Sequence, residues 1–164
     1  MNWYVLQVMT GREREVCEAL RRKGVKARAP AQRMEIRRRG QWQTEERLLL
    51  PGYVFVGVDY SAALFHVVSP VYGVIRWLGL HCGEPQALDA REALRWRLDS
   101  EETLKPSRVL FHEDGTWHVL DGPLAAFEGC PVRMERRAYV TAELGGIARR
   151  VRFGVIPVTE GSGP

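Results

Sequence analysis

The sequence predicts an α+β protein in which an antiparallel sheet covered by helices is joined through a short linker to a small all-β barrel. Three observations predict this. A strand, a helix and a helix stop follow one another within residues 1–24. Residues 109–160 hold only short β-rich runs separated by turns. Between these parts, residues 100–108 are polar, contain Pro106 and lack hydrophobic periodicity, as expected of a linker.

The chain has 164 residues, 45% of them hydrophobic and 27% charged, which is a globular composition and excludes wholesale disorder. This length fits two small domains, which we place at 1–99 and 109–160, with a disordered tail at 161–164. No apolar run reaches the length of a membrane span, because Arg76 interrupts the best candidate. The N-terminus also lacks a signal-peptide pattern, so we expect a soluble, cytoplasmic protein.

In the first domain, the apolar run Trp3–Met9 predicts a strand buried on both faces. Thr10 and Glu13 fit a capping box, which predicts that the Thr10 side chain caps a helix. Gly24 supplies the stop of that helix. Residues 33–47 read as a β-hairpin with a basic tip at 37–40.

Further along, Tyr53–Val58 and Gly73–Leu78 predict two more strands. Ser61 and Asp89 are expected to cap short helices, and Leu94 and Leu98 to lie on the buried side of the second one. The expected barrel strands come after the linker, at 116–120, 130–134, 138–144 and 149–153.

The placement of charge suggests a polyanionic partner, and nucleic acid is the obvious one. Residues 1–50 contain twelve basic and six acidic side chains, and residues 129–158 contain six arginines and two glutamates. These two basic segments are separated by an acidic one, although the chain as a whole carries a net charge of only +4.

Neither a metal site nor catalytic chemistry is expected. The three cysteines are odd in number and far apart, which favours free buried thiols over disulfides. No histidine or cysteine spacing matches a zinc site, and no phosphate-binding loop, paired acidic motif or activated nucleophile is present. We therefore expect no metal, no cofactor and no enzymatic activity. The residues concerned are Cys17, Cys82, Cys130, His66, His81, His112 and His118.

Four segments in the correct order resemble the NusG family of transcription factors. WYVLQVMTGRE at 3–13, LPGYVFV at 50–56 and GVIRWLG at 73–79 are similar to its N-terminal (NGN) domain. VLDGPLAAFEG at 119–129 resembles a KOW motif, the signature of a small SH3-like barrel. Within the family, the Gly122-Pro123-Leu124 run, the Arg136-Arg137 pair and Gly145-Gly146 are similar to the specialised LoaP group, and RfaH is a more distant relative.

The resemblance implies a monomer that binds the clamp helices of RNA polymerase and promotes antitermination. The residues it implies for polymerase binding are Tyr4, Leu50, Pro51, Tyr53 and Phe55. Phe55, as a strand residue, could equally belong to the core. Phe127 takes the place of the aromatic that KOW domains present to ribosomal protein S10 or to Rho.

Basic residues are the candidates for contact with nascent RNA or non-template DNA, because arginine forks match phosphate oxygens. The competing interpretations are a solvated helix face for Arg12 and Arg14, a solubilising hairpin tip, and arginines on outward strand positions. The candidates are Arg12, Arg14, Arg37, Arg38, Arg39, Arg133, Arg136, Arg137, Arg149, Arg150 and Arg152.

Three functions remain open from the sequence. The leading one is a processive antiterminator recruited or aided by nascent RNA. The second is a general NusG that couples polymerase to Rho or to a translating ribosome through Phe127. The third, from another class, is an RNA-binding protein that uses its KOW barrel alone.

Overall fold

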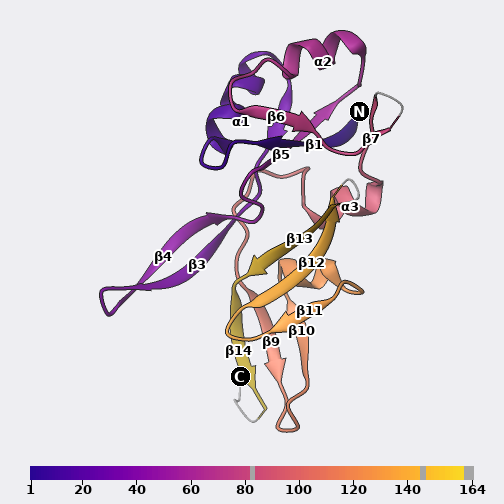
Figure 1. Ribbon diagram of the computed structural model, residues 1–164. Helices are drawn as coiled ribbons and strands as arrows, with labels where there is room; N and C mark the ends of the chain where they lie inside the picture. Colours follow the sequence, from indigo (N-terminus) through magenta and orange to yellow (C-terminus); the bar gives the residue numbers. More distant parts are fainter. Residues whose placement is uncertain (82–83, 145–146, 161–164) are drawn as a thin grey trace. The chain divides into compact units, whose positions relative to one another are not determined.

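The computed structural model describes residues 1–81, 84–144 and 147–160 (Figure 1). Cys82, the Gly145-Gly146 pair and the expected tail at 161–164 lie outside the described residues. Contacts divide the chain into two compact units. Unit 1 comprises 1–30, 50–101 and 143–149, and unit 2 comprises 31–49, 102–142 and 150–164.

Unit 1 is built on a four-stranded antiparallel sheet in the order β2-β5-β1-β6. The expected strands at the N-terminus and at Tyr53–Val58 are both present, and they pair along most of their length because both are continuously apolar. The bounds are β1 Asn2–Val8, β2 Lys26–Arg28, β5 Tyr53–Val58 and β6 Val74–Trp77. A two-stranded pair follows, β7 Leu80–His81 and β8 Glu84–Pro85.

Unit 1 also contains the helices α1 Glu13–Arg22 and α2 Ala62–Val68 (Figure 1). Both helices supply apolar side chains to one face of the sheet. The apolar stripe of α1 and Val68 of α2 join the strands in one buried cluster. Gly24 ends α1 as expected, with φ +80° and its N–H on the carbonyl of Arg21. Ser61 caps α2 by accepting the Leu64 N–H at 3.1 Å.

The opposite face of the sheet is covered by the segment that contains α3, Ala90–Arg95, and the residues that follow it. Phe55 lies against Trp96, with ring centroids 5.5 Å apart. Asp89 caps α3 as expected, but the expectation that Leu94 is buried is wrong, because Leu94 is 70% exposed. The helix ends at Arg95 and Arg97 takes a positive φ of 51°, so the helical spacing that would place Leu94 beside the buried Leu98 is interrupted.

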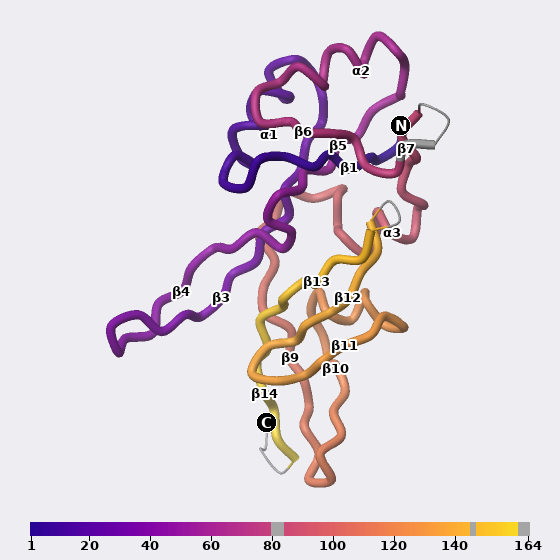
Figure 2. The backbone as a smooth tube through the Cα atoms, viewed as in Figure 1, coloured from indigo at the N-terminus to yellow at the C-terminus, as the bar shows by residue number. Residues whose placement is uncertain are grey.

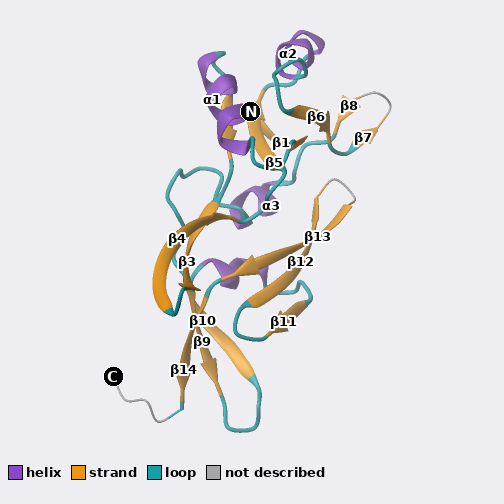
Figure 3. Cartoon of the chain, turned by 60° about the vertical axis from the view of Figure 1, so that its left-hand side comes forward, coloured by secondary structure: helices purple, strands orange, loops and turns teal. Residues whose placement is uncertain are grey.

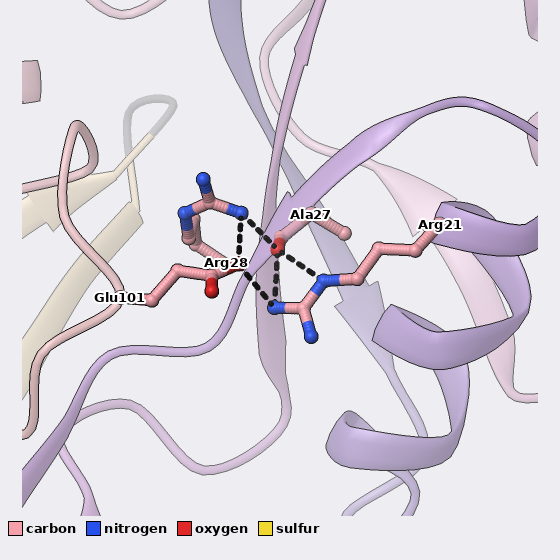
Figure 4. Close-up of polar contacts among 4 residues, drawn as sticks. All are labelled: Arg21, Ala27, Arg28 and Glu101. Carbon is pink, nitrogen blue, oxygen red and sulfur yellow. Dashed lines mark hydrogen bonds and ion pairs between the residues drawn. The ribbon is translucent and has the colours of Figure 1, made fainter.

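Two arginines of unit 1 are held by a structural network at the edge strand (Figure 4). Arg21 of α1 and Arg28 of β2 both donate to the carbonyl of Ala27, at 2.9 and 3.1 Å. Glu101 lies 3.0 Å from the Arg28 guanidinium and 3.6 Å from that of Arg21. These contacts satisfy the backbone carbonyl of Ala27 on the edge strand. Part of the positive charge of the N-terminal region therefore stabilises the fold.

Unit 2 contains the expected hairpin, β3 Ala31–Arg38 and β4 Gln41–Leu48. The register pairs Arg38 with Gln41, so the loop has two residues. Both loop residues, Arg39 and Gly40, have positive φ (51° and 77°), as a type I′ turn requires.

The rest of unit 2 is almost entirely β-structure (Figure 3), and the course of the chain through these segments can be followed in Figure 2. All four strands expected after the linker are present, which confirms the α+β class with antiparallel sheets, whereas β9 and β14 were not expected. The three-stranded sheets have the orders β10-β9-β14, with β14 parallel to β9, and β11-β12-β13. The bounds are β9 Ser107–Phe111, β10 Trp117–Asp121, β11 Val132–Met134, β12 Ala138–Leu144, β13 Ile147–Phe153 and β14 Val155–Thr159, with a 3₁₀ helix at Pro123–Phe127.

The hairpin is fixed to these strands through a buried polar residue, Gln32. Its amide donates to the carbonyl of Arg152 and accepts the N–H of Gly154 at 3.0 Å. On the other side, Leu104 of the expected linker bonds the backbone of Ala31 and Arg33, both at 2.8 Å. The segment 100–108 is therefore partly a structural element, because Leu104 is buried and bridges to β3.

A close backbone approach explains the glycine of the Asp121-Gly122-Pro123 turn. Ser107 is fully buried, and its Oγ accepts the Leu124 N–H at 2.9 Å. A Cβ on Gly122 would lie 2.5 Å from Ser107 Cα, and the Gly122 backbone (φ 100°, ψ −179°) is in a region populated essentially by glycine alone.

Within the described ranges, the helices are too short and insufficiently apolar for any of them to traverse a bilayer.

Candidate functional site

The Leu50-Pro51-Gly52-Tyr53 segment forms a tight turn at the start of β5. The Tyr53 N–H bonds the Leu50 carbonyl at 3.2 Å, and Gly52 has φ +90°, as a type II turn with proline before glycine requires. The Gly52 carbonyl accepts the Val8 N–H at 2.8 Å, which ties the turn to the end of β1. The turn is thus rigid and leaves Pro51 exposed.

Glu13 holds this turn, and this corrects the predicted capping box. Thr10 makes no capping bond to α1, whose N-cap residue is Arg12. Instead, the buried Glu13 carboxylate accepts the Gly52 N–H at 2.8 Å and the Gly11 N–H at 3.0 Å. The carboxylate is drawn away from the expected reciprocal bond because the buried amide of Gly52 needs an acceptor. The sequence identified Glu13 as a residue that accepts a backbone hydrogen bond, but it did not predict the partner, Gly52, which lies 39 residues later.

Of the residues expected to contact polymerase, Pro51 is exposed, while Leu50, Tyr53 and Phe55 are buried. Strand register explains which of them share a face. Tyr53 and Phe55 pair with Gln7 and Val5, so they lie on the sheet face that Trp96 covers.

Tyr4 lies on the other face of the sheet and does not join the group around Pro51. It pairs with Val56 and is buried in the cluster beneath α1 and α2. Its ring contacts those of Tyr60 and Trp77, with centroids 5.8 and 5.9 Å away. The two-residue alternation along β1 therefore makes Tyr4 a core residue, which corrects its expected place at the surface.

The start of α1 and the loop before β6 form one exposed surface, which we name the Tyr72 surface and define as Met9, Arg12 and Tyr72. The Arg12 guanidinium lies 5.2 Å from the centre of the Tyr72 ring, and Tyr72 is 69% exposed. The Met9 N–H bonds the Gly73 carbonyl at 2.8 Å, so the two segments are directly joined. Arg12 also pairs with Glu15, which raises the pKa of its guanidinium. Arg14 is exposed on α1 and has a partner of its own.

The three arginines of the hairpin tip differ in their contacts. Arg38 pairs with Glu45, which holds the pKa of that carboxyl below its usual value, and Arg47 binds the same carboxyl at 2.6 Å. Arg37 and Arg39 are exposed. The positive charge of the tip is therefore partly neutralised by Glu45 of β4. Arg37 lines a cleft between the hairpin and the C-terminal strands.

The arginines of the C-terminal region are likewise divided. Arg133 pairs with Glu135 at 2.6 Å, and Arg150 lies over the Tyr139 ring at 5.1 Å. Arg149 donates to the Tyr53 hydroxyl within unit 1 and lies 5.4 Å from the centre of its ring. Arg136 lies in the turn between β11 and β12 together with Arg137, and Arg152 is exposed on β13.

Phe127 is not a surface residue, which corrects the expectation that it presents its ring to a partner. It is 2% exposed, and its ring centroid lies 5.0 Å from that of Phe153. The 3₁₀ helix Pro123–Phe127 directs the Phe127 ring inward. The presence of an aromatic residue in the KOW motif therefore did not reveal whether its ring points outward or into the core.

The two cysteines that the structure describes form no disulfide. Cys17 and Cys130 are free, and burial raises the pKa of the Cys17 thiol to about 11, which keeps it protonated at neutral pH. Among the residues that the structure describes, no group of three or more histidine, cysteine or acidic side chains is arranged to hold a metal ion.

Comparison with known proteins gives a consistent result. The family model described as "Transcription termination factor nusG" matches residues 1–97. The transcription termination/antitermination protein NusG of Pseudomonas aeruginosa is 31% identical over 140 residues, covering 78% of each chain. NusG of Escherichia coli K12 is 30% identical over 140 residues, covering 78% of this chain and 77% of that one.

Two further similarities extend over nearly the whole chain. NusG of Yersinia pestis is 28% identical over 175 residues, covering 98% of this chain and 96% of the other. A solved structure of Thermotoga maritima NusG superposes with a TM-score of 0.51 at 20% identity and covers 93% of each chain, which shows the similarity in fold. The chain belongs to the NusG family of transcription termination and antitermination factors.

Proposed function

We propose that this protein binds RNA polymerase through the surface around Pro51 and promotes processive antitermination, as a specialised member of its family. The observation that supports this most directly is the rigid turn at Leu50–Tyr53, locked by the buried Glu13 carboxylate. A fixed, exposed apolar side chain loses little conformational entropy on binding, and such residues form the anchors of protein interfaces.

The proposed mechanism is a shift of populations without any covalent step. A factor that binds the closed, elongating form of polymerase more tightly than the paused form raises the share of the elongating form. The Tyr72 surface supports an additional contact with the non-template DNA strand. Tyr72 offers a ring on which a base can stack, and Arg12 offers a cation beside it.

Burial of Phe127 favours the specialised function over general coupling to Rho or to ribosomal protein S10, because coupling was expected to use that ring. General coupling remains the second candidate, supported by the relatives named termination/antitermination proteins. The third, an RNA-binding protein that works through its KOW domain alone, makes no use of the Pro51 turn. The SH3-like KOW barrel, the NGN boundary at 99 and a monomeric state form part of this proposal.

Polymerase capture tests the Pro51 contact. We expect Pro51→Asp to weaken binding of the full chain to core RNA polymerase about tenfold or more, because a charge then enters a desolvated interface. Affinity is measured by titrating polymerase against labelled protein. Ala63→Asp is the matched control, since Ala63 is an exposed apolar residue of α2 in the same unit and the charge change is the same.

This experiment distinguishes three outcomes. Weakened binding by Pro51→Asp with normal binding by Ala63→Asp supports the proposed surface. Equal binding by wild type and Pro51→Asp contradicts it, and no binding by wild type removes the polymerase function altogether, which leaves the KOW-only alternative.

A further inference from the structure

Within unit 2, a cleft of about 900 Å³ lies between the hairpin and the C-terminal strands. We name it the hairpin cleft. Its walls come from β3 and β4, from the turn between β11 and β12, and from the start of β14. The residues that carry the argument are Arg37, Trp42, Arg136, Arg137 and Tyr139, all of which line it.

The two walls of the cleft are held together by buried contacts. Gln32, 2% exposed, bonds the backbone at Arg152 and at Gly154, where β13 passes into β14. Gly154 itself lines the cleft. A buried amide with both its donor and its acceptor satisfied is costly to break, so the hairpin is held in place beside the strands.

Three arginines in the cleft are available for an anion. In the ranges that the structure describes, the guanidinium groups of Arg37, Arg136 and Arg137 make no hydrogen bond or ion pair, in contrast to Arg38 and Arg133. An uncommitted guanidinium keeps its planar fork of donors, which matches phosphate oxygens. Arg37 comes from the hairpin and the other two from a turn about 100 residues later, so they converge only in the folded chain.

Aromatic rings accompany these cations. Trp42 is 66% exposed and stands directly opposite Arg37 in the hairpin register, so both side chains are on the same face. Tyr139 lies on the other wall, with Arg150 over its ring at 5.1 Å. Exposed indole is unfavourable in water and offers a face on which a nucleobase can stack.

Glu35 and Glu135 also line the cleft, and they set a limit on its positive charge. Arg133 pairs with Glu135 at 2.6 Å and offsets one of them. The net charge of the residues that line the cleft stays positive. Both features needed to bind a single nucleic-acid strand are present, namely cations for its phosphates and aromatic rings for its bases. A paired duplex could supply the phosphates but could not open its bases onto Trp42.

From this geometry we propose that the hairpin cleft binds single-stranded RNA, with a base stacked on Trp42 and neighbouring phosphates held by Arg136, Arg137 and Arg37. This deepens the proposed function and rests on it for the identity of the strand, because the single strand that leaves a transcribing polymerase is the nascent transcript.

Fluorescence anisotropy of the full chain with a labelled, unstructured RNA of about 10 nucleotides tests the proposal. Trp42→Ala should weaken binding about tenfold, and Trp42→Phe should retain most of the affinity because the stacking ring remains. Neither variant should disturb folding, since the side chain is largely in solvent.

Salt dependence tests the phosphate contacts separately. In the Arg136→Ala, Arg137→Ala double variant, the slope of log K against log salt should fall in magnitude by about 1.4, because each phosphate of a single strand that an arginine neutralises adds about 0.7 to it. Arg22→Ala, at an exposed arginine of α1, is the matched control and should leave slope and affinity unchanged.

The following results would overturn the proposal: equal affinity after Trp42→Ala, an unchanged salt slope in the double variant, or equal binding of a duplex RNA of the same length. A preference for single-stranded DNA of the same sequence would overturn the assignment to RNA. Polymerase is absent from these measurements, so failure of the cleft is distinguishable from failure at Pro51. Trp42→Ala should bind polymerase normally.

Discussion

Replacing Phe127 with alanine should destabilise the C-terminal region by about 3–5 kcal/mol, the range for removing a buried phenylalanine side chain. Phe127 is almost completely buried against Phe153, so the substitution leaves a cavity where the two rings meet. Amide hydrogen exchange read by mass spectrometry is the suitable measurement, because it reports the opening of β12 and β13 separately from that of the β2-β5-β1-β6 sheet.

Leu120→Ala provides the comparison for Phe127→Ala. Leu120 belongs to the same region but is 41% exposed, and its replacement should cost only about 0.5 kcal/mol. If Phe127→Ala left exchange protection unchanged while abolishing binding to S10 or Rho, the ring would be a contact residue and its assignment to the core would be wrong.

The second large effect is expected at Gly122. Gly122→Ala should cost about 2–4 kcal/mol, because backbone strain and overpacking against Ser107 act together. Ser107 cannot easily move away, since its N–H bonds Gly154 at 3.1 Å and its Oγ accepts the Leu124 N–H. The measurement is again exchange protection, read in β9 and in the 3₁₀ helix.

Gly129→Ala separates the two causes. Gly129 also has a positive φ, of 89°, but a Cβ there meets nothing within 4 Å. Only the cost of placing a non-glycine residue at a positive φ should remain, about 1–2 kcal/mol of stability. Equal losses in the two variants would show that contact with Ser107 contributes nothing.

Local patterns predicted most of the fold because they depend on neighbours in sequence. The apolar run Tyr53–Val58, the Ser61 cap and the Gly24 stop are each determined within a few residues, and all three are present. The failures involve partners that are distant in sequence. Glu13 follows the pattern of a capping box, yet the amide of Gly52 needs its carboxylate more than the helix terminus does.

The candidate site was less predictable for the same reason. Arg37 was selected from charge, and the Arg136-Arg137 pair from charge and from its resemblance to the LoaP group. The bonds of Gln32 to the chain about 120 residues later help to bring these arginines to one cleft. Trp42 was assigned only as a strand residue, although an exposed tryptophan beside an arginine-rich turn was a readable signal. Tyr4 and Phe127 show the opposite error: they were expected to contact partners, but both are buried. Aromatic identity does not reveal which face a side chain takes.

The most direct measurement is transcription by purified RNA polymerase across a terminator placed downstream of the native leader, with and without the full chain. Wild-type protein should increase the fraction of readthrough transcripts, Pro51→Asp should not, and Ala63→Asp should act like wild type. Readthrough that stays constant at protein concentrations sufficient to saturate polymerase would contradict the claim that this chain steadies the elongating enzyme.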